Sequence, residues 1–335
     1  MKRYLLWIFI LLTFSSSLFA ENYNSKTDVK KFINHMHKKF NYKKTYLKIL
    51  FSNVRKTPHI KIKTSSSKST KQKLHKKIKK GSWDKFSSLN IEQNRTKLGV
   101  KFMSKHKRTL TKVSKEYGIP AEYITAIIGI ESYYGANRGR YYVFDQLSHL
   151  AFSNHKRKKF YRYELQEFLR MCYREQVEPR AIKGSASGAI GLGQFLPSNY
   201  KKIAVDFNGD GKKRMNNYDD AIASIANYFK IHGWIKEEPV AVRVKYKGNR
   251  FHTFKTGLKY KYERKNLKDI YPKSFFNYKK KVMLIKLKRE SFDELWYATK
   301  NFYVLTRYNH SSYYAMAVHQ LAEKIKIEYN KQNNL

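Results

Sequence analysis

One segment, Pro120 to Gly135 (PAEYITAIIGIESYYG), limits the fold of this chain more than any other. Its proline suits a first helical turn and its glycine suits a helix stop. Ile124, Ile127 and Ile128 fall at positions i, i+3 and i+4, so they lie on one face of the helix. The next position on that stripe, i+7, is Glu131. The spacing therefore predicts a core helix that carries a carboxyl group where an apolar residue is expected.

A carboxyl group in such a place has a definite chemistry. Burial disfavours the charged form and raises the pKa, by up to ~3–5 units in full burial. A general acid that works near neutral pH needs a pKa raised in this way. The alternative is structural: Glu131 reaches solvent at the helix end, or pairs with Arg138 or Arg140. The spacing alone leaves both interpretations open.

The rest of the chain has mostly helical periodicity. Hydrophobic residues make up 41% of the 335 residues, enough for a large core. Residues 238–262 alternate between apolar and polar and contain Gly breaks, which predicts a short hairpin or an irregular lobe. The fold class expected is mainly α with a minor β element. Helices are expected at 94–117, 120–134, 160–177, 218–232, 291–300 and 311–329, with further helical spacing in 21–60 and a polar linker at 64–80.

The N-terminus has the features of an export signal. Lys2 and Arg3 are followed by the apolar run Leu5 to Phe14, and a small residue, Ala20, ends the segment. This pattern predicts a secretory signal peptide at residues 1–20 with cleavage after Ala20. The alternative is an uncleaved N-terminal anchor, although the apolar run is short for a membrane span.

The single cysteine, Cys172, excludes an internal disulfide and lies too far along the chain to carry a lipid at the cleavage site. Its helical spacing with Phe168 and Leu169 predicts a buried thiol.

The net charge is +45, from 70 Lys and Arg against 25 Asp and Glu. Such a charge attracts nucleic acid, acidic glycopolymers or anionic lipid alike. The export signal favours the cell envelope over nucleic acid. Because the lysines are spread along the whole chain, a solvated basic surface explains them equally well.

A second segment, Gly184 to Tyr200 (GSASGAIGLGQFLPSNY), is rich in glycine, which allows backbone to approach a ligand closely. Ser185 and Gln194 offer hydrogen bonds to hydroxyl or amide groups. The segment lacks the Gly-Lys-Ser/Thr ending of a phosphate loop. The structural alternative is a tight packing turn.

A third segment, DFNGDGKKRMNNYDD, places Asp206, Asn208 and Asp210 at alternate positions before Gly211. Oxygen ligands at positions 1, 3 and 5 with Gly at position 6 match a calcium loop, but Asn217 stands where the acidic position 12 belongs. Asp220 follows three residues later. The alternative is an Asx-rich turn that caps the next helix.

Tyrosines supply further candidates. Tyr308 and Asn309 precede a predicted helix and present a ring and an amide. Tyr133 and Tyr134 follow Glu131 after one serine and offer stacking surface beside it.

In this order, IIGIESYYG, KGSASGAIGLGQFLPSNY, DFNGDG and FYVLTRYNHSSYYAMAV closely resemble the lytic murein transglycosylase B family. The resemblance runs from about Phe32 to about Ile327. It implies a lysozyme-like, mainly α catalytic core with flanking α and β lobes around a deep groove. The domains expected are a signal peptide at 1–20, a basic α region with linker at 21–90, the core with an EF-hand-like loop at 91–235, a small β-containing lobe at 236–290 and a C-terminal helical part at 291–335.

The resemblance also implies site residues. Glu131 matches the catalytic glutamate. The substrate-binding positions matched are Ser185, Gln194, Tyr308 and Asn309. Arg157 falls where the family has a basic residue at the groove, although this chain is one residue shorter there than the family. The metal-binding positions matched are Asp206, Asn208, Asp210, the backbone of Lys212, and Asp220. The chemistry implied needs no cofactor, and a calcium ion would be structural.

The reaction implied is cleavage of the β-1,4 bond between N-acetylmuramic acid and N-acetylglucosamine without water, which leaves a 1,6-anhydromuramic end. Ordinary glycosidases use two carboxylates, but Glu131 is the one convincing acid near these motifs. Glu164 and Glu167, on a helix rich in Lys and Arg, are interpreted as surface ion pairs.

The competing functions are a muramidase that adds water, a catalytically inactive glycan-binding envelope protein, and a nucleic-acid-binding protein, which charge alone favours. The partners expected are peptidoglycan strands and other cell-wall synthesis or hydrolysis proteins, with no nucleic acid. A monomeric periplasmic protein is expected, membrane-anchored if the signal is retained.

Overall fold

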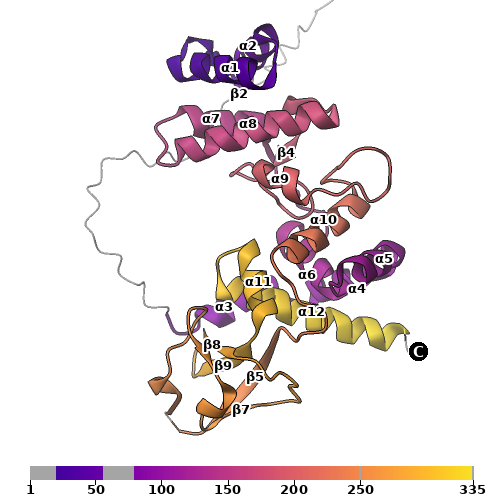
Figure 1. Cartoon of the computed structure of the whole chain (residues 1–335), viewed down its shortest axis with the longest axis vertical. Coiled ribbons are helices and arrows are strands. Elements are labelled where there is room, and N and C mark those ends of the chain that lie inside the picture. The colour runs from indigo at the N-terminus through magenta and orange to yellow at the C-terminus, as the bar shows by residue number, and fades with distance from the viewer. Residues whose placement is uncertain (1–19, 56–78, 249, 334–335) are drawn as a thin grey trace, which may run out of the picture.

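The computed structural model describes residues 20–55, 79–248 and 250–333. The predicted signal peptide up to residue 19 and most of the predicted linker at 64–80 lie outside these residues. The described chain is mainly helical with a small sheet, as expected, and it divides into three levels (Figure 1).

The upper level in Figure 1 is a helical lobe built from two separate stretches of sequence. The pair α7 and α8 makes extensive contact, and α1 and α2 lie above it. A short two-stranded sheet joins β1 to β2 beside them. The bounds are α1 (Thr27–Phe40), α2 (Lys44–Phe51), α7 (Val143–Phe152), α8 (Lys158–Glu175), β1 (Ala20–Glu21) and β2 (Val54–Arg55).

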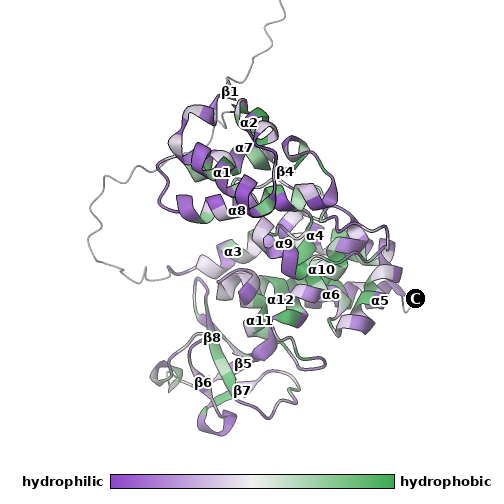
Figure 2. Ribbon diagram, turned by 45° about the horizontal axis from the view of Figure 1, so that its top comes forward, coloured by the Kyte–Doolittle hydropathy of each residue, from purple (hydrophilic) through white to green (hydrophobic). Residues whose placement is uncertain are grey.

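The middle level holds the central helix α6 (Ala121–Ser132), which is packed against α12, α4, α10 and α5. Apolar residues gather where these helices meet (Figure 2). The other elements here are α4 (Gln93–Lys105), α5 (Lys107–Tyr117), α9 (Pro197–Ile203), α10 (Tyr218–Ile231), α11 (Lys300–Tyr308) and α12 (Ser312–Asn333), together with the pair β3 (Tyr141–Tyr142) and β4 (Lys183–Gly184).

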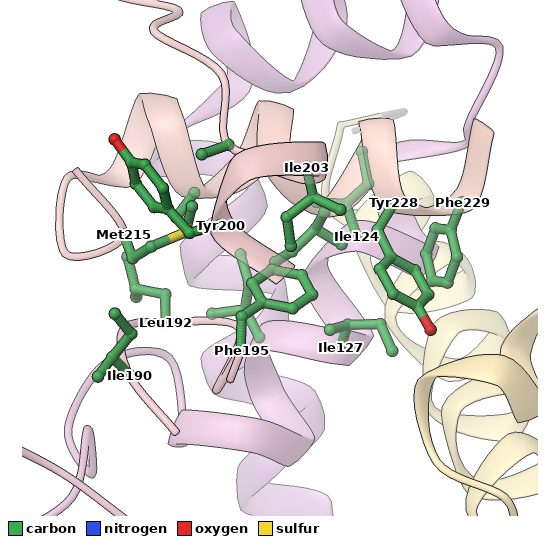
Figure 3. Packing of buried hydrophobic residues seen from close by; sticks show 14 of the residues in the cluster. Ile124, Ile127, Ile190, Leu192, Phe195, Tyr200, Ile203, Met215, Tyr228 and Phe229 are labelled. Carbon is green, nitrogen blue, oxygen red and sulfur yellow. The ribbon is translucent and has the colours of Figure 1, made fainter. Parts of the chain in front are cut away.

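The predicted apolar stripe of α6 is confirmed. Ile124, Ile127 and Ile128 have no exposed surface. Tyr123, Thr125, Ala126 and Gly129 are buried too, so the helix is enclosed on nearly all sides. Figure 3 shows Ile124 and Ile127 in one cluster with side chains of the Gly-rich segment and of α9 and α10. The helix that carries Glu131 is therefore held on nearly all sides.

The lower level is a five-stranded sheet of order β6-β8-β9-β5-β7, in which every neighbouring pair is antiparallel. Its outer strands are short, and α3 (Ser82–Asn90) contacts β8. The bounds are β5 (Ala241–Tyr246), β6 (Lys261–Tyr262), β7 (Ile270–Pro272), β8 (Val282–Lys288) and β9 (Asp293–Ala298).

The two faces of this sheet belong to different cores. Met283, Ile285 and Leu287 of β8 pack into the main core, whereas Val282 and Leu284 pack into a second cluster. Because successive side chains of a strand point to opposite faces, one face of the sheet is turned to the helical body and the other is turned away from it.

Several sequence predictions were wrong. The helix expected at 291–300 is the strand β9, so the sheet extends beyond the expected lobe boundary at residue 290. The helix expected at 94–117 is divided at His106 into α4 and α5. Of the two forms expected for residues 238–262, the hairpin is not formed, because β5 pairs with β7 and β9 while β6 pairs with β8, and the segment is part of the small sheet lobe.

Two side-chain predictions had opposite outcomes. Cys172 is buried and free, as predicted. Glu164 is not a surface residue: it is buried, and its carboxylate accepts hydrogen bonds from the backbone N–H and hydroxyl of Ser198 at 2.9 and 2.8 Å. Glu167 is ion-paired with Arg170, but it too is buried.

The helices of the described residues all lack the length and continuous hydrophobicity that a membrane-spanning helix needs.

Candidate active site

Glu131 lies in the last turn of α6, which ends at Ser132. The chain then turns sharply, because Tyr133, Tyr134 and Gly135 all have positive φ angles of 51°, 59° and 93°. Ser132 stabilises this turn: its hydroxyl donates to the carbonyl of Ile128 and accepts from the N–H of Gly135. The helix therefore ends one residue after the acid, three residues before the predicted stop at Gly135.

The Glu131 carboxyl group has one direct hydrogen-bond partner on another helix. The hydroxyl of Tyr314, near the start of α12, donates to Oε1 of Glu131 at 2.5 Å. The ring of Tyr314 is stacked with that of Tyr308 at the end of α11, with centroids 6.4 Å apart. The sequence draws attention to the tyrosines of this region but does not assign Tyr314 to the site.

The Gly-rich segment reaches the same place through Tyr308. Its hydroxyl donates to the carbonyl of Gly193 at 2.6 Å. A Cβ added at Gly193 would lie 2.7 Å from that hydroxyl and 2.7 Å from the Phe195 ring, so glycine is required for this close approach. The next residue, Gln194, has a left-handed backbone with φ of 48°.

Gln194 also ties the segment to the turn that follows Glu131. Its Nε2 donates to the carbonyl of Arg138 at 3.2 Å and to that of Gly191 at 2.8 Å. The predicted segments around residues 131, 194 and 308 are thus brought together by Tyr314, Tyr308 and the backbone of Gly193. Asn309 follows Tyr308 directly and is exposed.

The environment of Glu131 favours the protonated carboxyl group. Burial raises its pKa to about 7, while the hydrogen bond from Tyr314 acts in the lowering direction. The negative end of a helix dipole lies at the C-terminus, where Glu131 sits, and it further disfavours a carboxylate. Burial also holds the pKa values of Tyr308 and Tyr314 well above the usual range, so both remain neutral donors.

No second carboxyl group among the described residues contributes to the pKa shift of Glu131. Aromatic rings pack behind Tyr314, the partner of the acid: Tyr308 is stacked on Tyr314, and Phe195 and Tyr228 each pack against Tyr308, with centroid distances of 5.2 and 4.8 Å. This arrangement holds a single neutral acid beside uncharged donors and suits proton transfer by one group.

The comparisons with known proteins agree with this geometry. A family model described as "Transglycosylase SLT domain" matches residues 24–323. The chain belongs to this family.

Individual relatives match this chain along most of its length. It is 37% identical over 249 residues to the membrane-bound lytic murein transglycosylase B of Escherichia coli strain K12, a match that covers 74% of this chain and 68% of the relative. The solved structure of E. coli lytic transglycosylase Slt35 in complex with calcium is 31% identical to this chain, with a TM-score of 0.80. The match covers 95% of this chain and 98% of the Slt35 chain. The structure of soluble lytic transglycosylase SltB1 of Pseudomonas aeruginosa is 34% identical, with a TM-score of 0.79. The match covers 90% of this chain and 99% of the SltB1 chain.

Two other predicted site residues, Ser185 and Arg157, make contacts within the protein. Ser185 closes a turn, because its Oγ accepts from the N–H groups of Ser187 and Ala189 at 3.2 and 3.0 Å. Arg157 lies at the start of α8 with its guanidinium 4.1 Å from the centroid of the Phe160 ring. Their role in substrate binding stays a prediction.

Tyr134 has packing contacts within the protein, and its predicted stacking on substrate stays a prediction. Its hydroxyl donates to the carbonyl of Arg95 at 2.8 Å. Its ring fills the space left by two glycines, since a Cβ at Gly99 or Gly129 would lie 2.6 Å from the Tyr134 hydroxyl oxygen. Tyr134 therefore packs α4 against α6. The physical reason is the left-handed turn after Glu131, which directs this ring back onto its own helix.

The acidic segment forms a series of Asx turns. Asp206 accepts from the N–H groups of Gly209 and Gly211 at 2.9 and 2.8 Å. Asn208 accepts from the N–H of Asp210, and Asp210 accepts from the N–H of Lys212. These bonds orient oxygen atoms at alternate positions of the loop.

Asp220 closes this loop from the next helix. It has no exposed surface, and its two oxygens accept from the N–H groups of Phe207 and Arg214 at 2.9 and 2.8 Å. Asn217, the residue at the usual twelfth position, caps α10 instead. Within the described residues no group of three or more His, Cys, Asp or Glu side chains is close enough to hold a metal ion. Any cation here would also need the amide oxygen of Asn208 and backbone oxygen.

Proposed function

We propose that this chain is a lytic transglycosylase that cleaves the glycan strand of peptidoglycan, with Glu131 as its only catalytic carboxyl group. The observation that carries this proposal is the partly buried Glu131, whose pKa is raised to about 7 by its removal from solvent and which has no carboxylate partner within the described chain. Membership of the transglycosylase family and the names of its relatives support the substrate.

The proposed mechanism uses Glu131 twice. Protonated Glu131 donates its proton to the glycosidic oxygen, and the substrate's own N-acetyl group supports the positive charge that develops at C1. Ionised Glu131 then takes the proton of the C6 hydroxyl, whose oxygen attacks C1 of the same sugar and forms the 1,6-anhydro ring. The internal hydroxyl outcompetes water as the nucleophile because it is held close to C1, with an effective molarity of ~10⁵ M or more.

The surrounding residues have separate roles in this proposal. Tyr314 orients the carboxyl group and remains a donor when Glu131 is ionised between the two proton transfers. Gln194 and Asn309 are proposed to bind the sugars on either side of the acid. Ser185 and Arg157 are proposed to bind the strand farther from it.

We also propose a structural calcium ion in the loop of Asp206, Asn208, Asp210, Lys212 and Asp220. The Asx turns of this loop and the calcium named in the Slt35 structure support it. The ion takes no part in the proton transfers. Calcium at millimolar concentration is expected to raise the melting temperature of the protein more than magnesium does. Equal effects of the two ions would contradict a specific site.

The proposed location is the periplasm, with export by residues 1–20. The E. coli relative is named as membrane-bound, whereas this chain has no cysteine at the predicted cleavage site. Protein partners in cell-wall synthesis or hydrolysis remain part of the proposal.

Digestion of purified sacculi tests the reaction. The proposal predicts muropeptides that end in 1,6-anhydromuramic acid, which are lighter by one water than the products of hydrolysis. Mass spectrometry of the released material distinguishes the two. Products with a reducing end would establish a muramidase, and the absence of any release by folded protein would favour a binding protein.

A further inference from the structure

The loop between β7 and β8 covers the sheet face that is turned away from the helical body. Phe276 and Tyr278 of this loop are buried in the second cluster with residues of β5, β8 and β9. Arg264 fixes the loop further, because its guanidinium donates to the carbonyls of Phe276 and Tyr278 at 3.2 and 3.0 Å. The loop therefore has a defined position on the outer face.

One aromatic residue of this fixed loop points outward. Phe275 is 93% exposed, the largest value among the exposed large apolar side chains of the described chain. Its neighbour Phe276 is buried in the second cluster, so the two adjacent rings have opposite environments. Since burial of Phe276 fixes the loop, the exposure of Phe275 is imposed by the fold. A phenyl ring held in water has no favourable contact until another apolar phase covers it.

Basic residues flank this ring along the loop. Between Tyr271 and Lys281 the chain has four lysines, at positions 273, 279, 280 and 281, and no Asp or Glu. All four are exposed, although Lys280 and Lys281 also pair with Glu238 and Glu263.

A cavity of about 690 Å³ adjoins both ends of the loop. Its lining includes Tyr271 and Tyr278 of the loop region and the basic side chains of Arg264, Lys265, Lys268 and Lys279, against the acidic Glu263 and Asp269. A cavity with an excess of positive charge beside an exposed ring can receive an anionic headgroup.

We propose that this outer face, formed by residues 271–281 and the adjoining cavity, docks the protein on an anionic phospholipid bilayer. Phe275 enters the interfacial region, the lysines lie among the headgroups, and the cavity receives a lipid phosphate. An exposed aromatic residue within a basic surface is the combination that binds membrane interfaces. A soluble polyanion would use the lysines but would leave the ring in water, so the ring favours a bilayer.

This docking is independent of the chemistry at Glu131. The loop packs on the sheet face opposite the main core, and the sheet occupies one end of the molecule (Figure 1). Docking by that end leaves the helical body, with Glu131 and Tyr314, outside the bilayer.

Co-sedimentation with vesicles tests the proposal. The chain beginning at Ala20 keeps every described element and removes the apolar N-terminal segment, which would bind lipid by itself. It is expected to sediment with vesicles of equal parts phosphatidylglycerol and phosphatidylcholine and to stay in solution with phosphatidylcholine alone. Phe275→Ser is expected to weaken binding about tenfold. Ile49→Ser, which changes an apolar residue 68% exposed on the upper lobe, is the matched control.

A paired charge experiment separates this surface from the general basicity of the chain. Lys273→Gln with Lys279→Gln is expected to weaken vesicle binding roughly fivefold per lysine. Lys201→Gln with Lys202→Gln, two exposed lysines of α9, removes the same charge elsewhere and is expected to have a small effect.

A direct readout is the tryptophan fluorescence of the Phe275→Trp variant. Its added emission is expected to shift to shorter wavelength with anionic vesicles and to be quenched by brominated lipid. Three results would each overturn the proposal: unchanged binding of Phe275→Ser, equal losses in the two lysine pairs, or an emission spectrum of Phe275→Trp that does not respond to anionic vesicles. Normal circular dichroism and normal release from sacculi by each variant show that the fold is intact.

Discussion

Glu131 is a partly buried carboxyl group and Asp220 a fully buried one, and they lie at opposite ends of their helices. Glu131 is in the last turn of α6, and Asp220 is in the first turn of α10. Burial is the largest influence on both pKa values and raises both. Three backbone N–H groups oppose this effect at Asp220, whereas a single phenol opposes it at Glu131.

The helix dipoles add to this difference. The N-terminal end of α10 favours a negative charge at Asp220, and the C-terminal end of α6 disfavours one at Glu131. Burial alone therefore does not make a catalytic acid. A buried carboxyl group surrounded by N–H donors stabilises a loop, and one at a helix C-terminus with few donors retains its proton.

The largest expected effect is on catalysis at Glu131. Glu131→Gln is expected to lower the rate of anhydromuropeptide release by about 10³-fold or more, because an amide can neither donate nor accept the proton. Turnover on sacculi, followed by chromatography, measures this. Glu122→Gln is the control on the same helix: Glu122 is also buried but pairs with Lys326. Substantial residual activity of Glu131→Gln would refute the assigned role.

Isosteric changes at the two carboxyl groups are expected to act on stability with opposite sign. The folded-state pKa of Glu131 is about 7 against an ordinary value of 4.5. Between these values the folded state binds more protons than the unfolded state, so ionisation costs stability as the pH rises. Glu131→Gln is therefore expected to raise the free energy of unfolding at pH 8 by up to about 3 kcal/mol, and to leave it unchanged at pH 4.

Asp220→Asn is expected to lower the free energy of unfolding by about 2 kcal/mol, because the amide NH₂ would face a buried backbone N–H and leave it without an acceptor. Urea unfolding of both variants at the two pH values measures these changes. Asp219→Asn, at the partly exposed neighbouring position, is the control. Changes of the same sign at pH 8 would remove the distinction between the two carboxyl groups.

The smallest expected effect concerns the single donor to Glu131. Tyr314→Phe removes the hydrogen bond that acts to lower the pKa of Glu131, so the pKa rises above about 7. A general acid loses activity as the pH rises through its pKa, so the alkaline limb of the rate profile is expected to move up by about one pH unit. Tyr313→Phe is the control, since that hydroxyl contacts Ser82 and the N–H of Lys288. An unshifted limb would contradict the assigned influence of Tyr314.

The sequence predicted the acid because its signal is local. Three isoleucines on one helical stripe place Glu131 within a few residues. Tyr314 is 183 residues away, and nothing in its own surroundings distinguishes it from the adjacent Tyr313. Its role depends on how α12 packs against α6, which no local pattern encodes.

The misassigned strand β9 has a similar explanation. Phe292, Leu295 and Trp296 have helical spacing, i, i+3 and i+4. The strand lies in the middle of the sheet with buried residues on both faces: Leu295 and Tyr297 pack into the second cluster, and Ala298 packs into the main core. A strand covered on both sides loses the alternation that would identify it.

The enclosure of α6 restricts how the enzyme can work. Because neighbours hold this helix on almost every side, and the Tyr314 hydroxyl contacts its carboxyl group, the proposed mechanism leaves most of the movement between the two proton transfers to the sugar. After the glycosidic bond breaks, the ring has to tip until its own sixth carbon brings a hydroxyl to the place that the departing oxygen has left. The stationary acid thus selects substrates whose ring is free to make that movement.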